Sequence, residues 1–135
     1  TGLRLAAPGL WDAPPADWAS FAAPGLCPSA AGLSFVFRAI TPPGRTRRFD
    51  ARFFLADAAH VLGDTDDFSD ASDELSHLHW VPLAEARRLD LPFVTEIVLA
   101  EVEALIEAGV LDGAAPDSVP FFDNSGPVSQ FRRLV

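Results

Sequence analysis

The sequence predicts one α+β domain over residues 1–135, with a small antiparallel sheet packed against one long helix. Residues 33–40 and 48–57 alternate in polarity and are rich in β-forming side chains, which favours two strands. Residues 92–109 carry a mostly apolar stripe at helical spacing, which favours a helix. Strands and a helix that do not alternate regularly along the chain are typical of an α+β arrangement.

Turn and helix signals predict the secondary structure in the first half of the chain. The pair Pro14–Pro15 starts a short helix that Pro24–Gly25 ends, because proline suits the first helical turn and a Pro-Gly pair stops it. The Pro- and Gly-containing stretch 41–47 is a turn. It joins the two predicted strands as an antiparallel hairpin.

The second half carries weaker signals. Residues 74–81 alternate around Leu78 and Trp80, which predicts a third strand, and Pro82 permits a short helix over residues 82–90. A DNSGP turn separates two apolar stretches near the end of the chain. This pattern predicts a terminal hairpin over residues 119–135.

Composition and charge exclude several classes of protein. The chain has a formal net charge of −9, and all ten basic residues are arginine. This acidic balance argues against a broad nucleic-acid groove. No apolar run approaches the ~18 residues of a membrane-spanning helix. The single cysteine, Cys27, excludes an internal disulfide framework. We expect a cytoplasmic protein, and the Arg, Ala and Pro richness is typical of a GC-rich bacterial genome.

Residues 64–74 form an acidic loop, and its spacing does not fit the EF-hand pattern. Phe68 and Leu75 stand where an EF-hand that begins at Asp64 needs oxygen ligands. A solvated acidic loop is the favoured interpretation, and loose binding of a divalent ion is the alternative.

Two histidines, His77 and His79, share one face of the predicted third strand. With His60 they could chelate zinc, although no fourth ligand follows at a fixed offset. Solvent-facing histidines are the favoured interpretation, and a zinc site is the alternative.

A basic patch stands out in this acidic sequence. Its members are Arg38, Arg45, Arg47, Arg48 and Arg52. The favoured interpretation is that Arg52 pairs with Asp50 and the other arginines are solvated. Contact with an anionic ligand is the alternative, because guanidinium groups suit phosphate oxygens. Arg38 and Arg52 lie on adjacent predicted strands, and we expect them to approach one another.

Several segments together resemble the part of a Nudix hydrolase that follows its catalytic box. RAITPPGRTRRFDARFFLAD (38–57) and ELSHLHWVPLAEA (74–86) are similar to the hairpin and the Trp-containing strand of bacterial Nudix proteins. The helix at 92–108 is similar to the C-terminal helix of the family. Thr1-Gly2-Leu3 matches the last three positions of the box. The TP…RRFD…FFLA segment is similar to enzymes of the coenzyme A diphosphatase type.

The resemblance implies a Nudix-like mixed sheet with flanking helices, an α/β/α sandwich that we expect to be incomplete in this chain. The metal-binding glutamates of the box would lie before Thr1. The full-length parent would use Mg²⁺ or Mn²⁺ to cleave a diphosphate linkage in a nucleoside diphosphate derivative. The chain alone is expected to be inactive. Arg38, Arg48 and Arg52 would contact the substrate, and Glu74 would be a catalytic acid or base in a later loop.

Two other functions remain open from the sequence. One is a non-catalytic Nudix-like module that binds a nucleotide, and the other is an unrelated α+β interaction domain. An incomplete sheet exposes apolar surface, which predicts self-association into a homodimer. No nucleic-acid or membrane partner is expected.

Overall fold

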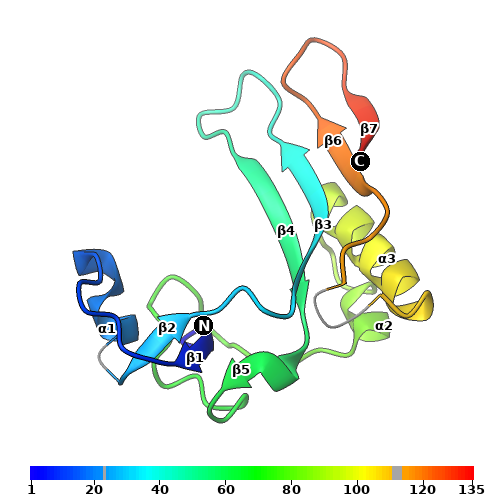
Figure 1. Cartoon of the computed structure of the whole chain (residues 1–135). Helices are drawn as coiled ribbons and strands as arrows, with labels where there is room; N and C mark the ends of the chain where they lie inside the picture. The colour runs from blue at the N-terminus through cyan, green and yellow to red at the C-terminus, as the bar shows by residue number, and fades with distance from the viewer. Residues whose placement is uncertain (23, 111–113) are drawn as a thin grey trace. The chain divides into compact units, whose positions relative to one another are not determined.

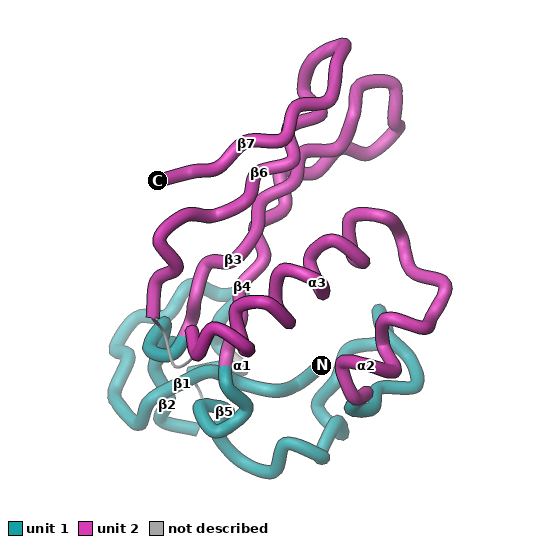
Figure 2. Tube along the Cα trace, turned by 90° about the vertical axis from the view of Figure 1, so that its right-hand side faces the viewer, with its two compact units in different colours: residues 1–32, 57–80 teal, residues 33–56, 81–135 magenta. Residues whose placement is uncertain are grey.

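A computed structural model describes the chain over residues 1–22, 24–110 and 114–135. It confirms the α+β class, with two sheets and several helices. The chain divides into two compact units, which Figure 2 shows in different colours. Unit 1 holds residues Thr1–Gly32 and Asp57–Trp80, and unit 2 holds Leu33–Ala56 and Val81–Val135. The sequence pattern did not indicate this division.

Unit 1 contains a three-stranded antiparallel sheet in the order β2-β1-β5. Its strands are β1 (Arg4–Pro8), β2 (Leu26–Pro28) and β5 (Val61–Leu62). The predicted short helix after Pro15 is present as the 3₁₀ turn η1 (Ala16–Trp18) and α1 (Ala19–Ala22). A second 3₁₀ turn, η2 (Ala58–His60), precedes β5.

The predicted third strand over residues 74–81 is wrong. This segment consists of turns, bends and irregular backbone. His77 has a φ of 57°, in the left-handed region that no strand can use. The indole Nε1 of Trp80 donates to the backbone oxygen of Thr65 at 3.0 Å, so the segment bonds to its own loop and not to a neighbouring strand. The two histidines therefore do not share a strand face.

Unit 2 contains a mixed four-stranded sheet in the order β4-β3-β6-β7 (Figure 1). Its strands are β3 (Leu33–Ile40), β4 (Asp50–Ala56), β6 (Val119–Asp123) and β7 (Gln130–Leu134). The hairpins β3–β4 and β6–β7 are antiparallel, as the sequence predicts, and β3 pairs in parallel with β6. The short α2 (Leu83–Ala86) stands where a helix over 82–90 is predicted.

A β-bulge in β3 changes which side chains enter the core. Phe35 lies opposite Phe54, whereas Phe37 lies opposite Phe53, so Val36 is the extra residue. Val36 and Phe37 are consequently both buried. The regular alternation expected over residues 33–40 is therefore interrupted between Phe35 and Phe37.

The long helix α3 (Phe93–Glu107) covers one face of the sheet. Val98 packs with Phe37 and Ala39 of β3, and partly buried side chains of α3 surround them. The helix is followed by Gly109, which adopts a φ of 74°. The N–H of Val110 donates to the backbone oxygen of Leu105, which is the bond expected of a glycine-terminated helix.

Candidate functional site

Three arginines and one phenylalanine form a row across the sheet of unit 2. Arg52 of β4 lies opposite Arg38 of β3, Arg38 lies opposite Phe121 of β6, and Phe121 lies opposite Arg132 of β7. Residues directly opposite on paired strands share one face of a sheet. This arginine row (Arg52, Arg38, Phe121 and Arg132) therefore crosses all four strands on one face.

The members of the arginine row differ in exposure. The side chains of Arg52 and Arg132 are 53% and 54% exposed, whereas that of Arg38 is 26% exposed. The guanidinium of Arg38 lies 4.6 Å from the ring centre of Phe121, in a cation–π contact that helps to cover the buried ring. The two ends of the row are thus open to a ligand, and its middle is held against the sheet.

Acidic side chains occupy the neighbouring row. Asp50 accepts hydrogen bonds from Arg38 Nε at 2.8 Å and Arg38 Nη2 at 2.7 Å, which is the bidentate geometry of a strong ion pair. Nη2 of Arg52 lies 3.5 Å from the same carboxylate. The hydrogen bond from Arg38 is the main reason that the pKa of Asp50 lies below its ordinary value, and the pKa of Arg38 is raised in turn.

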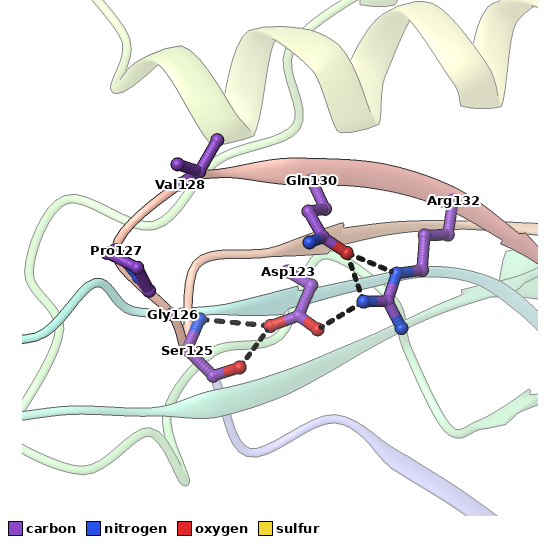
Figure 3. A pocket seen from close by; sticks show the side chains of 7 residues that line it. All are labelled: Asp123, Ser125, Gly126, Pro127, Val128, Gln130 and Arg132. Atoms are coloured by element: carbon purple, nitrogen blue, oxygen red, sulfur yellow. Dashed lines mark hydrogen bonds and ion pairs between the residues drawn. The ribbon is translucent and has the colours of Figure 1, made fainter.

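The β6–β7 turn positions the other end of the row (Figure 3). Oδ1 of Asp123 accepts from the backbone N–H of Ser125 at 2.9 Å and from its hydroxyl at 2.5 Å. These bonds hold the pKa of Asp123 below its usual range, with smaller contributions from Arg132 and Arg38. Arg132 Nη2 lies 3.8 Å from Asp123 Oδ2, and Arg132 also donates to Oε1 of Gln130.

A hollow of about 310 Å³ opens beside this end of the row. Its lining comes from the β6–β7 turn and from Asp123, Gln130 and Arg132. Three guanidinium groups and two carboxylates together leave one net positive charge on this face, in a chain of net charge −9. The face can therefore contact an anion.

The structure brings together two of the predicted substrate-binding residues. Arg38 and Arg52 are direct cross-strand partners, and Asp50 pairs with both, so the favoured ion pair between Arg52 and Asp50 is also present. Arg48 does not join the row. Its Nε donates to the backbone oxygen of Thr41 at 3.2 Å in the β3–β4 turn. Glu74 lies exposed in a loop of unit 1, and its catalytic role stays a prediction.

Sequence reasoning missed Arg132 as a site residue. A signal was present, because alternation along residues 128–135 places Gln130 and Arg132 on one face of the predicted strand. The identity of the strand beside β6 could not be obtained from that alternation. Without the parallel pairing of β3 with β6, nothing connects Arg132 to Arg38.

The described residues do not fit a divalent metal. Among residues 1–22, 24–110 and 114–135, no group of three or more His, Cys, Asp or Glu side chains could hold one. The acidic loop uses its carboxylates locally. Asp64 accepts from the backbone N–H of Asp66, and Asp67 accepts from that of Ser69. The Ser69 side chain first, and then its backbone N–H, hold the pKa of Asp67 below its ordinary value. Asp70 pairs with Arg4 at 2.8 Å.

Within the described part of the chain, no helix combines the length and apolar character needed to cross a membrane. Comparisons with models of protein families, with curated proteins and with solved structures found no match for this chain. The functional argument consequently rests on the geometry of the site and on the sequence motifs.

Proposed function

We propose that this chain is part of a Nudix-type hydrolase that cleaves a diphosphate linkage in nucleoside diphosphate derivatives, and that the arginine row contacts the phosphates. The alignment of Arg52, Arg38 and Arg132 across the mixed sheet carries this proposal. Guanidinium forks match the spacing of phosphate oxygens. The half-exposed ends of the row keep guanidinium nitrogens without a described partner, so they are available to a substrate.

The resemblance adds Mg²⁺ or Mn²⁺ as the cofactor, and the composition of the chain adds a cytoplasmic setting to the proposal. Because the described residues offer no metal site, the role proposed for this chain is substrate binding. Arg52 and Arg132 would supply charge to the diphosphate. Arg38, bound to Asp50, would keep the row in register.

A non-catalytic nucleotide-binding module is the second candidate. The same arginine row supports it, because binding of a diphosphate requires the positive face and not the hydrolytic step. The two candidates differ only in turnover by the full-length parent. An unrelated α+β interaction domain is the third candidate, and it predicts no nucleotide binding.

Calorimetric titration of the 135-residue chain with ADP-ribose and with coenzyme A tests the proposal. We expect measurable binding that weakens with added salt. Arg52→Gln and Arg132→Gln should each weaken it about fivefold, since each removes one charge-assisted contact. Arg88→Gln is the matched control, because this exposed arginine lies outside the sheet. Absence of binding to both compounds, or equal losses in all three variants, would overturn the proposal.

A further inference from the structure

A second groove in unit 2 lies where the end of the β3–β4 hairpin meets the first turn of α3. Its volume is about 470 Å³, and apolar side chains line most of it, with Phe49 and Phe53 as its aromatic walls. This α3 groove shares no lining residue with the arginine row. Its size is that of a small-molecule site.

The first turn of α3 leaves backbone donors unsatisfied at the groove. Pro92 occupies the cap position and offers no side-chain acceptor. Its backbone oxygen accepts from the N–H groups of Thr95 and Glu96, at 2.8 and 3.1 Å. Among the described residues, the N–H groups of Phe93 and Val94 have no acceptor. The positive end of the helix dipole is therefore uncapped where Val94 and Thr95 line the groove.

Asn124 supplies an independent observation. It is only 6% exposed, it lines the α3 groove, and its side-chain amide has no hydrogen-bond partner among the described residues. Buried polar side chains are normally bonded. In the described part of the chain, every side-chain N or O atom that is sealed from solvent has a partner, so the unpartnered amide of Asn124 is not sealed. Because Asn124 lines the α3 groove, we place the open side of the amide there. It is placed to donate to a ligand there.

The charge of the groove selects the sign of that ligand. Of the described residues that line it, Arg45 is the one charged side chain, and no carboxylate joins it. Glu96, the acidic residue of the first helical turn, is outside the lining. We propose that the α3 groove binds a small organic oxyanion, a phosphate or a carboxylate carried on an apolar group. The oxyanion would meet Arg45, Asn124 and the helix terminus, and the apolar group would lie on Phe49.

Amide chemical-shift titration of the whole 135-residue chain with phenyl phosphate, benzoate and benzyl alcohol tests this site. We expect saturable shifts at Val94, Thr95 and Asn124 with both anions, and the tighter of the two identifies the preferred oxyanion. Benzyl alcohol should bind about tenfold more weakly, because it cannot use the charged and dipolar donors. Equal binding of the alcohol, or shifts confined to the strand residues of the arginine row, would overturn the proposal.

Two neighbouring arginines provide a matched pair of variants. Arg45→Gln should weaken phenyl phosphate binding about fivefold. Arg47→Gln should leave it unchanged, because Arg47 is exposed in the same turn but does not line the groove. Equal effects of the two changes would show attraction by general charge and refute the site. Asn124→Asp should also weaken binding. Because Asn124 is buried, this variant can fail to fold. In that case the Arg45 variant decides the test.

The ADP-ribose titration and this titration can fail separately. Absence of nucleotide binding would refute the proposed hydrolase function and would not affect the proposal for the α3 groove. Absence of phenyl phosphate binding would refute the proposal for the α3 groove and would not affect that for the arginine row.

Discussion

Arg38 and Asp50 are joined by two parallel hydrogen bonds, at 2.8 Å from Nε and 2.7 Å from Nη2. The two residues lie on neighbouring strands as a diagonal pair. The direct partner of Arg38 is Arg52, and Asp50 lies two residues before Arg52 on the same strand. The two bonds thus fix the orientation of the Arg38 guanidinium group, which also covers the ring of Phe121. One ion pair therefore orients the centre of the arginine row.

Replacement of Asp50 by asparagine should make stability less dependent on pH. The bond from Arg38 lowers the pKa of Asp50 below its ordinary value of 3.8. Its stabilising contribution is therefore complete above that ordinary value and is lost as the pH falls through the lower, folded-state pKa. We expect the variant to have a lower free energy of unfolding at neutral pH. We also expect that free energy to change less between about pH 5 and about pH 2 than it does in the unaltered chain. Urea unfolding at these pH values measures both, and identical curves for the two proteins would contradict the expectation.

Gly109→Ala should destabilise unit 2 by about 1–2 kcal/mol through backbone strain alone. Gly109 has a φ of 74°, and a Cβ there would meet no atom within 4 Å. Gly126→Ala is the control, because Gly126 has the same open surroundings but no positive φ. Thermal and urea unfolding compare the two variants. A loss of similar size in both would show that strain at the helix end is not the cause.

Phe54→Ser should reduce self-association of the chain. The Phe54 side chain is 54% exposed on the edge strand β4, and its ring lies 5.4 Å from that of Phe35. Exposed apolar edge strands favour pairing between chains, which is the basis of the expected homodimer. Light scattering over a range of concentrations measures the change. Leu89→Ser, which alters an exposed apolar residue outside the sheet, should have no effect.

The 135-residue chain should not hydrolyse ADP-ribose or coenzyme A in the presence of Mg²⁺ or Mn²⁺. Hydrolysis of this kind needs a bound divalent metal, and the described residues include no group of three or more His, Cys, Asp or Glu side chains that could hold one. Chromatographic separation of the two phosphomonoester products, at high protein concentration, measures the turnover. Robust metal-dependent turnover by the chain would refute the expectation, and the arginine variants would then be assayed for activity.

The elements that the sequence predicted are those specified by local patterns. The β3–β4 hairpin and α3 each have a clear periodicity and a Pro or Gly signal at their ends, so neighbouring residues determine them. Strands β2 and β5 are only three and two residues long, too short to show a period. The segment 74–81 has the alternation of a strand, but a left-handed His77 and the bond from Trp80 override it.

The candidate site was predicted in part for the same reason. Arg38 and Arg52 belong to one hairpin, so their approach follows from a short turn and strand alternation. Arg132 reaches the row through the pairing of β3 with β6, which joins distant parts of the chain. Asn124 looked like an ordinary turn residue, and its burial beside α3 depends on tertiary packing that no local pattern reports.

The parallel pair of β3 and β6 also determines the order in which unit 2 can assemble. Arg38 and its partner Phe121 are 83 positions apart, whereas the β3–β4 hairpin closes over a short turn. Contacts between distant residues form slowly, because a long loop must close first. During synthesis β3 and β4 can therefore pair while the edge of β3 that faces β6 is still unpaired. Pulse-labelled hydrogen exchange should show protection of β4 before that of β6.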